Sequence, residues 1–444
     1  MTERMSNLDA AWLHMEDSTN LMMIVGLMWF DRPVDWAAIR GVIRDRLIAR
    51  YPRFRQRVTE GALASPRWEV DPHFDVEAHL HHVALPAPGD QAALQELVSD
   101  LMSTPLDFSK PLWQFHLVDG FGGGGAIIYR IHHCVGDGIS LARVLLSLAD
   151  DAGDAGVAGE PGAREHGFHP LAAARRGLER ARHTADALTD PKRLAALARE
   201  GVEGAEELAD LLALPADPAS VLKGPLGVRK RAVWAAPTPL VAVKRACKAR
   251  GCTLNDGLIA AMTGALRRYL AGRGQEVAAL RAFVPVNMRP LDEPVPTTLG
   301  NRFTLVLLEL PVGEADPEAR LSLLKARMDH LKGGTQAAVN YGLLHAMGAT
   351  PARVERVVAD IFGAKATAVM TNVPGPREPL SLAGNPVSGI QFWVPQAAHL
   401  GLGVSIFSYA GEVTVGIAAD AGLVPDPEAL VAAFEAELRD FIAG

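Results

Sequence analysis

Apolar positions follow two alternating patterns along the first 150 residues. Residues 21–31 form a nearly continuous apolar run, which predicts a buried strand. Residues 36–48 place apolar side chains at helical spacing, and this pattern stops at Tyr51-Pro52, because a residue before proline avoids the helical conformation. The same patterns recur downstream. We expect further strands at residues 76–85, 113–118 and 126–131, and helices at 90–102 and 139–148.

A second series of elements follows a break in the pattern. Residues 151–166 and 215–220 have linker composition, and the Ala-, Arg-, Glu- and Leu-rich stretch 171–214 between them is expected to be helical. Tyr409-Ala410-Gly411-Glu412 is a hairpin-turn signal. We expect strands at residues 231–234, 282–285, 304–310, 366–371, 390–395, 401–409 and 412–418, and helices at 240–248, 255–270, 317–331, 336–347, 351–362 and 427–442.

These patterns predict an α/β protein with two halves. The simplest division is an N-terminal half at residues 1–165, a helical connector at 166–225 and a C-terminal half at 226–444. The length of 444 residues fits either three domains or two large ones, since a typical domain has about 150 residues.

Composition and charge narrow the possible classes of protein. The apolar content of 49% supplies ample material for cores and excludes a disordered chain. The net charge of -7 argues against a nucleic-acid binder. Three cysteines are too few for a disulfide framework and point to a reducing compartment. No export signal is visible, and the longest apolar run near the start has ten residues, whereas a bilayer needs about 20. We therefore expect a cytoplasmic location, with peripheral contact at the inner face of the membrane left open.

The sharpest chemical feature is the segment at residues 131–138, Ile-His-His-Cys-Val-Gly-Asp-Gly. A predicted strand delivers His132 and His133 into a short loop, Asp137 follows, and Gly138 precedes a helix. A neutral imidazole can accept a proton from an alcohol near neutral pH, and a well-placed general base accelerates a reaction roughly 10²–10⁴-fold. Gly136 and Gly138 are expected to allow backbone angles that other residues resist. The residue types therefore suit acyl transfer.

Three other interpretations of this segment remain open on residue types alone. The histidines are polar residues at a strand rim, or they belong with Asp137 to a metal site, or Cys134 is a nucleophile. No further His or Cys cluster stands nearby to complete a coordination shell. Cys134 points to the opposite strand face from His133 if the extended pattern continues.

Several motifs, taken in order, also resemble a known family. The segment 132–138 looks like the HHxxxDG signature of the acyltransferases related to chloramphenicol acetyltransferase and to condensation domains of peptide synthetases. More narrowly, the chain resembles the bacterial wax ester synthase/acyl-CoA:diacylglycerol acyltransferase family over nearly its whole length. The matching segments are MSNLDAAWLHMED at the start, PLW at Pro111, Leu112 and Trp113, the Asn255-Asp256 pair, VPVNMRP, LGNRF, NVPGP around Asn372, Pro374 and Gly375, and SYAGEVTVGIAAD near the end.

The resemblance implies a fold and a role for each loop residue. The fold would be two chloramphenicol-acetyltransferase-like halves with an active-site channel between them, which the two substrates enter from opposite faces. His133 would be the general base, and His132 and Gly138 would support the loop. Asp137 would be structural and held by an arginine, for which Arg289 is our candidate.

The resemblance also implies an activity. The protein would move a fatty acyl group from acyl-CoA to diacylglycerol or a long-chain alcohol, giving triacylglycerol or wax ester. It would need no metal or prosthetic group, and acyl-CoA would be a co-substrate. Two alternatives are a condensation-type acyltransferase that uses a carrier-protein thioester and a non-catalytic lipid-binding relative.

The remaining motif residues have structural interpretations beside functional ones. Trp113 is expected to be core packing, and Asn255 is expected to cap a helix whose first turn contains Asp256. Pro374 and Gly375 are expected to shape a rigid loop near the channel. The connector carries basic residues that either rest on anionic lipid or form a solvated helix face. These are Arg175, Arg176, Arg180, Arg182, Lys192 and Arg193.

Overall fold

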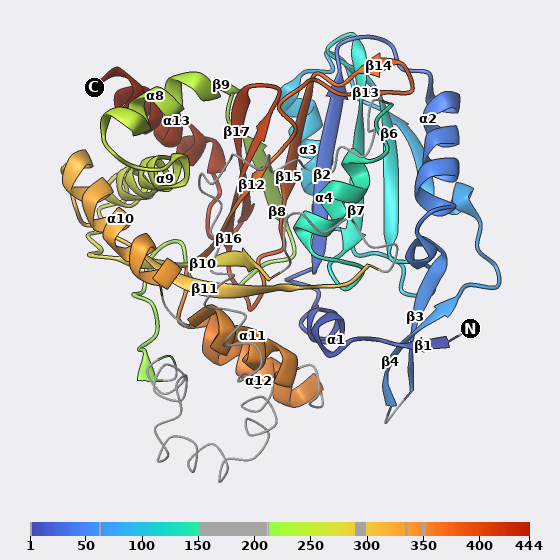
Figure 1. Ribbon diagram of the computed structural model, residues 1–444, viewed down its shortest axis with the longest axis horizontal. Coiled ribbons are helices and arrows are strands. Elements are labelled where there is room, and N and C mark those ends of the chain that lie inside the picture. The colour runs from blue at the N-terminus through green and yellow to red at the C-terminus, as the bar shows by residue number, and fades with distance from the viewer. Residues whose placement is uncertain are drawn as a thin grey trace.

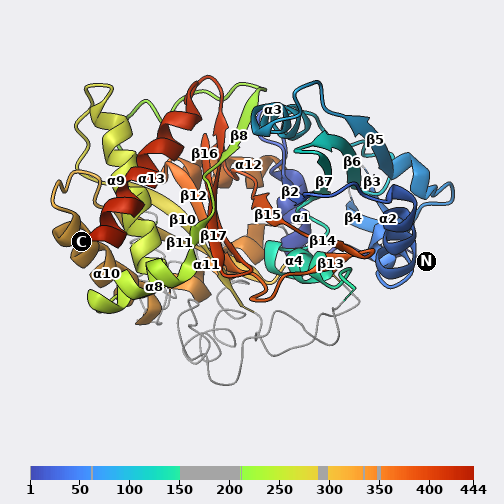
Figure 2. The same cartoon turned by 90° about the horizontal axis from the view of Figure 1, so that it is seen from above.

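Two large β-sheets organise the part of the chain that the computed structural model describes. These residues are 2–61, 64–150, 211, 213–288, 299–333, 336–347 and 352–444. One sheet belongs mainly to the N-terminal half and the other to the C-terminal half, and they lie side by side (Figures 1 and 2). Most of the expected connector, including its basic residues, lies outside the described residues, so the division at 165/166 and 225/226 stays a prediction.

The N-terminal sheet has the strand order β15-β2-β7-β6-β5, in which only β5 and β6 run parallel. Its β6–β7 hairpin turns through Gly122 and Gly123, whose φ angles of 56° and 85° are the positive values that a two-residue hairpin turn uses. The elements of this half are α1 (Asn7–His14), β2 (Met23–Phe30), α2 (Trp36–Val42), η1 (Ile43–Ile48), η2 (Pro52–Arg55), η3 (Val76–His79), β5 (Leu80–Ala84), α3 (Gln91–Met102), β6 (Trp113–Phe121), β7 (Gly124–His132) and α4 (Gly138–Leu146).

The C-terminal sheet has the strand order β11-β10-β12-β16-β17-β8, with β9 paired to β17. Figure 1 shows α8, α9, α10 and α13 on the outer side of this sheet, and α11 packs against both β11 and α1. Its elements are β8 (Lys230–Trp234), β9 (Thr238–Pro239), α8 (Leu240–Ala249), α9 (Leu254–Ala271), β10 (Leu280–Asn287), β11 (Phe303–Leu310), α10 (Pro317–Gly333), α11 (Gln336–Met347), α12 (Ala352–Gly363), β12 (Ala368–Pro374), β16 (Leu402–Tyr409), β17 (Glu412–Asp420) and α13 (Pro427–Ala443).

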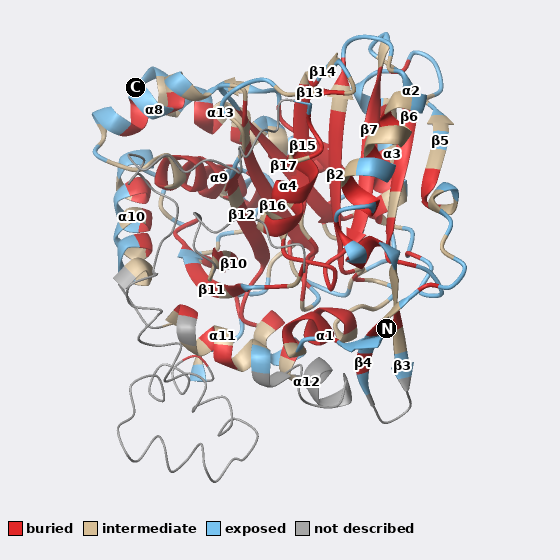
Figure 3. Cartoon of the chain, turned by 45° about the vertical axis from the view of Figure 1, so that its right-hand side comes forward, coloured by how far each residue is buried: buried red, intermediate tan, exposed pale blue. Residues whose placement is uncertain are grey.

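Strand β15 (Gly389–Trp393) comes from the C-terminal half but completes the N-terminal sheet. It pairs antiparallel with β2, from Gly389 opposite Trp29 to Trp393 opposite Val25. The Trp393 ring also lies 5.6 Å from that of Trp234 in β8, measured between centroids. Buried residues therefore run without a break from β2 and β7 through β15 to β16 and β17 (Figure 3).

Helix α3 joins the two halves a second time. The hydroxyl oxygens of Ser99 and Ser103 accept hydrogen bonds from the main-chain N–H groups of Ala232 and Lys230, over 2.9 and 2.8 Å. Strand β8 lies at an edge of its sheet, so side-chain acceptors satisfy N–H groups that a neighbouring strand would otherwise take.

Most elements were predicted from the sequence, but several features were not. The first part of the strand expected at residues 76–85 is instead the short 3₁₀-helix η3. The Asp75 carboxylate accepts the Glu77 N–H over 3.0 Å and so starts this helical turn. Only Leu80–Ala84 pairs with β6. Helix α1 was not predicted. Neither were the small sheets of β1 (Thr2–Arg4), β3 (Gln56–Gly61) and β4 (Ala64–Val70) and of β13 (Ser381–Leu382) and β14 (Asn385–Pro386).

No helix in these described ranges combines the length and the apolar character that crossing a bilayer requires.

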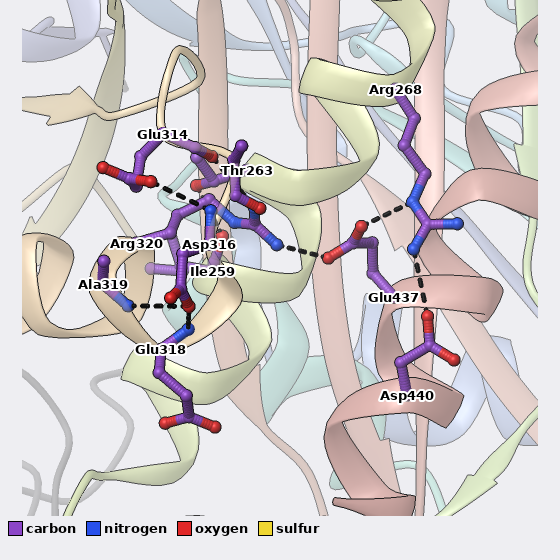
Figure 4. Close-up of polar contacts among 11 residues, drawn as sticks. Ile259, Thr263, Arg268, Glu314, Asp316, Glu318, Ala319, Arg320, Glu437 and Asp440 are labelled. Atoms are coloured by element: carbon purple, nitrogen blue, oxygen red, sulfur yellow. Dashed lines mark hydrogen bonds and ion pairs between the residues drawn. The ribbon is translucent and has the colours of Figure 1, made fainter.

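A buried ionic cluster ties three helices of the C-terminal half together (Figure 4). The Glu437 carboxylate on α13 pairs with Arg320 on α10 and with Arg268 on α9, and Arg268 also reaches Asp440 over 3.0 Å. Arg320 is 3% exposed, so its buried positive charge is stabilised by the negative charge of Glu437. Gly264 on α9 leaves the space that the pair occupies, since a Cβ there would lie 2.1 Å from a Glu437 oxygen.

We predict that Gly264→Ala lowers the stability of the protein. Alanine favours a helix over glycine by about 1 kcal/mol, but displacing the buried carboxylate strains the cluster by about 1–3 kcal/mol. The matched control is Gly41→Ala in α2, where a Cβ meets nothing within 4 Å and should be neutral or stabilising. Urea unfolding measures both variants. A Gly264→Ala midpoint at or above that of wild type would contradict the prediction.

Candidate active site

Main-chain hydrogen bonds hold the loop that carries both histidines. His132 ends β7, and its N–H donates to the carbonyl of Leu112 over 3.0 Å. The N–H of His133 donates to the carbonyl of Met22 over 2.7 Å, just before β2. Within the loop, the Val135 N–H returns to the carbonyl of His132 over 3.0 Å. The histidine backbone is therefore fixed by two segments that lie far from it in the sequence.

The His132 ring is fully buried and is the neutral tautomer with its proton on Nε2. Its Nδ1 accepts the Cys134 N–H over 3.0 Å, so that nitrogen carries no proton. Its Nε2 lies 2.9 Å from Oε2 of Glu16, in a close contact that is not aligned as a hydrogen bond. The Phe108 ring approaches edge-on at 5.7 Å. His132 therefore faces protein groups, in agreement with a supporting role.

The His133 ring belongs to a cluster of three aromatic rings. Trp12 stacks on it with centroids 4.2 Å apart, and Phe303 lies 5.2 Å away. Trp12 and Phe303 are themselves only 5.3 Å apart, so they cannot cover opposite faces of the imidazole. His133 is 4% exposed, and its Nδ1 is buried without a hydrogen-bond partner in the described part of the chain. Any substrate must therefore reach a nearly enclosed ring.

Burial sets the protonation state of this ring. Loss of solvation lowers the pKa of His133 to about 3, and the nearby His132 ring acts in the same direction. The carbonyl of His133 itself and the side chain of Asn301 raise the pKa, by less. The imidazole is therefore neutral at pH 7 and can accept a proton.

Residues 299–303, which belong to the C-terminal half, hydrogen-bond to the histidine loop. The Asn301 amide donates to the His133 carbonyl over 2.8 Å and to the Asp9 carboxylate over 2.8 Å, and the Asn301 N–H reaches the same carboxylate over 2.9 Å. Burial raises the pKa of Asp9 despite these bonds. Asn301 thus links helix α1 to the loop that carries the two histidines.

Asp137 is held by main-chain groups at the end of the loop. One carboxylate oxygen accepts the Ser140 N–H over 2.7 Å and caps α4, and the other accepts the Arg302 N–H over 2.9 Å. Arg289, the expected partner, lies outside the described residues.

The expectation for the two loop glycines is wrong. Neither Gly136 nor Gly138 adopts a positive φ. Gly138 is the first residue of α4 and therefore has ordinary helical geometry, and a Cβ there would meet nothing within 4 Å.

The structure also bears on the nucleophile and metal interpretations. Burial raises the pKa of the Cys134 thiol well above its usual value, so it stays protonated. Within the described ranges, no three His, Cys, Asp or Glu side chains are grouped to hold a metal ion.

The Pro111-Leu112-Trp113 motif also supports the loop that carries the two histidines. Trp113 is 1% exposed, its indole N–H donates to the Phe54 carbonyl over 2.8 Å, and it stacks on His79. It is core packing, as predicted. Leu112 supplies the carbonyl that binds the His132 N–H, so the motif acts on the loop through the main chain.

The two asparagine motifs of the C-terminal half meet each other. The Asn372 amide on β12 donates to the Asn255 side chain on α9 over 3.0 Å. Asn255 is not the helix cap: Thr253 is, in a capping box that its hydroxyl forms with Asp256. In the described part of the chain, no hydrogen bond or ion pair connects this pair to His133.

Pro374 and Gly375 end strand β12 close to its neighbour. Pro374 is the last residue of β12, and the Gly375 N–H donates to the Ser408 carbonyl over 2.9 Å. A Cβ on Gly375 would lie 2.2 Å from that oxygen, so only glycine allows this approach.

A small cavity of about 20 Å³, with room for about one water molecule, lies where the two halves meet. Its wall includes Leu21 and Met23, which flank the Met22 carbonyl that binds the His133 N–H. It is mostly apolar, with two polar side chains. Its lining residues are Leu21, Met23, Met102, Lys230, Val394, Pro395 and Gln396.

Sequence reasoning did not identify the residues that touch the histidine rings. Trp12 and Glu16 belong to the N-terminal motif, and Asn301 and Phe303 belong to LGNRF. In the sequence analysis, both motifs supported only the family resemblance. The sequence did contain a hint of their role, since Asp9 and Trp12 are three residues apart and therefore lie on one face of the short helix α1.

Comparison with known proteins connects this geometry to a family. A family model described as the wax ester synthase/diacylglycerol acyltransferase catalytic domain matches residues 5–258, and the corresponding C-terminal domain matches residues 299–441. A protein of Mycobacterium tuberculosis (strain ATCC 25618 / H37Rv) described as a probable diacylglycerol O-acyltransferase is 31% identical, over 99% of this chain and 96% of its own length.

Solved structures establish the same fold. A wax ester synthase/diacylglycerol acyltransferase from Marinobacter aquaeolei VT8 has a TM-score of 0.69 at 23% identity, covering 99% of this chain and 98% of that one. The first condensation domain of the calcium-dependent antibiotic synthetase has a TM-score of 0.63 at 17% identity, covering 100% and 96%. The predicted condensation-domain-like α/β fold is thus confirmed. With the two family matches, these results show that the chain belongs to the wax ester synthase/diacylglycerol acyltransferase family and is an acyltransferase.

Proposed function

We propose that this enzyme transfers a fatty acyl group from acyl-CoA to the hydroxyl of diacylglycerol or a long-chain alcohol, with His133 as general base. The products are triacylglycerol or wax ester and free CoA. One observation carries the residue assignment. His133 is a neutral imidazole with an unpartnered ring nitrogen, on a loop held by segments from both halves.

The mechanism follows from the state of that imidazole. The acceptor hydroxyl attacks the thioester carbonyl while a ring nitrogen of His133 takes its proton. The tetrahedral intermediate then collapses, the carbon–sulfur bond breaks, and the imidazolium returns the proton to the CoA thiolate. His132, Asp137 and Gly138 act in this scheme by keeping the loop in place, and Arg289 is proposed as a further partner of Asp137.

The route of the substrates is proposed from the cavity between the halves. Its lining is mostly apolar, and Leu21 and Met23 bring it beside Met22, whose carbonyl binds the His133 N–H, so an acyl chain that widened this cavity would pass close to the loop. In this proposal Asn255, Asn372 and Gly375 shape the C-terminal wall of the channel rather than take part in chemistry.

Both proposed acceptors partition into lipid, which favours work at a membrane or lipid-droplet surface from the cytoplasmic side. The basic connector residues are our candidates for that contact, because Lys and Arg near an anionic surface each contribute about 1 kcal/mol.

We predict that His133→Ala abolishes ester formation while the protein stays folded. Loss of the base should lower kcat at least about 100-fold. The assay supplies palmitoyl-CoA with hexadecanol and diacylglycerol together and identifies the labelled product, which also reveals the preferred acceptor. His82→Ala is the matched control, since His82 is a half-exposed surface histidine paired with Asp119. Near-normal turnover by His133→Ala would remove the general-base assignment.

We predict that activity persists at mildly acidic pH. Only the neutral ring accepts a proton, so activity falls as pH drops through the pKa of His133 in the folded enzyme. Because this pKa is about 3, the fall of activity at low pH should occur far below the pH of about 6.5 at which an ordinary histidine gains its proton. Between pH 7.5 and 5.5, kcat/KM for the acceptor should change less than about twofold, whereas an unperturbed histidine would cause a tenfold loss. Fluorescence at each pH confirms folding, and an acid limb near 6.5 would contradict this prediction.

We predict that replacing Arg175, Arg176, Arg180 and Arg182 with Gln weakens binding to anionic vesicles at least about tenfold. Sedimentation with vesicles of anionic and of zwitterionic lipid measures the effect, which should shrink as salt is added. Unchanged sedimentation with anionic vesicles would count against membrane contact through the connector.

A further inference from the structure

The Glu16 carboxylate lies between the end of β7, from which the histidine loop emerges, and the start of β2. Its Oε2 accepts the Met22 N–H over 2.9 Å and lies 2.9 Å from Nε2 of His132. The Glu16 side chain is 10% exposed and that of His132 is 0% exposed. A single oxygen atom therefore faces two buried N–H groups, one at the end of β7 and one just before β2.

The neighbours of this oxygen connect directly to His133. Met22 receives the Glu16 contact at its N–H and binds the His133 N–H through its carbonyl, over 2.7 Å. His132 is fixed on its other side by the Cys134 N–H, over 3.0 Å. Glu16 therefore contacts both residues that hold His133 in place: Met22, which binds its N–H, and His132, which precedes it in the chain.

The tautomer of His132 explains why a carboxylate suits this place. Because Nδ1 accepts the Cys134 N–H, the only ring proton is on Nε2, where an anionic oxygen attracts it. Without that oxygen, the Met22 N–H would be buried without an acceptor and the ring proton would lose the negative charge nearest to it, so the loop would be free to shift toward other partners.

We propose that Glu16 is a positioning residue for acyl transfer, which holds His132 and the start of β2 so that the His133 imidazole meets the substrate hydroxyl. This inference rests on the proposed function, because it assigns Glu16 a role only through His133. Glu16 itself contacts no reacting atom in this account. Its effect should therefore appear in kcat and not in substrate binding.

The test compares three substitutions in the full-length enzyme. Glu16→Ala removes the acceptor, Glu16→Asp keeps the charge but withdraws it by one methylene, and Glu16→Gln keeps the length and one acceptor oxygen. Glu60→Ala is the matched control, because Glu60 lies 3.5 Å from His14 at an exposed site and forms the same kind of carboxylate–histidine contact. Steady-state kinetics with palmitoyl-CoA and hexadecanol give kcat and KM, and thermal unfolding reports folding.

Glu16→Ala should lower kcat about 10- to 100-fold, the range seen when the partner that orients a metal-ligating histidine is removed, with KM changed less than about threefold. Glu16→Gln should restore most of kcat, Glu16→Asp should restore less, and Glu60→Ala should match wild type. If Glu16→Ala does not fold, the order of the Gln and Asp variants still decides. More activity in Asp than in Gln would show that charge matters instead of position and would overturn the proposal.

A kcat of folded Glu16→Ala within twofold of wild type would also overturn it. The His133→Ala variant separates this inference from the proposed function. If His133→Ala is active, the general-base assignment fails, whatever Glu16 does. If His133→Ala is inactive and all Glu16 variants match wild type, only the positioning role of Glu16 fails.

Discussion

An imidazole and its main chain can be buried only if their polar groups find partners, and the loop with His132 and His133 meets this condition largely through distant segments. Met22 and Leu112 bind the two backbone N–H groups, and Asn301 binds the His133 carbonyl. Two ring nitrogens of the loop are exceptions in the described ranges: Nε2 of His132, whose contact with Glu16 is not aligned as a hydrogen bond, and Nδ1 of His133. Nε2 of His132 carries the proton of its neutral ring, so the nitrogen free to accept a proton is on the residue proposed as the base.

This requirement explains how the two halves are joined. Strand β15 crosses to the N-terminal sheet, α3 caps the edge strand β8, and Asn301 links α1 to the loop through Asp9. Each connection lies beside the loop or beside a strand that supports it. The position of His133 therefore depends on how the two halves dock.

Burial has a chemical consequence as well. The environment that keeps His133 neutral also makes an isolated imidazolium unfavourable, so the ring is a weak base in the empty enzyme. In the proposed mechanism, however, the imidazolium forms together with the oxyanion of the tetrahedral intermediate. Opposite charges that arise side by side in a medium of low dielectric stabilise each other, and Trp12 and Phe303 maintain that medium.

The sequence by itself determined the local elements, the HHxxxDG loop and the family. Helical and strand periodicity depend on neighbouring residues, so helices such as Gln336–Met347 and the Ala410-Gly411 turn were predicted correctly. Only the tertiary structure decided which residues surround the loop. Glu16, Asn301 and Phe303 act across about 115 to 170 positions of chain, and β15 pairs with a strand more than 350 residues earlier. Periodicity carries no information at such separations, because those contacts arise from how the sheets dock.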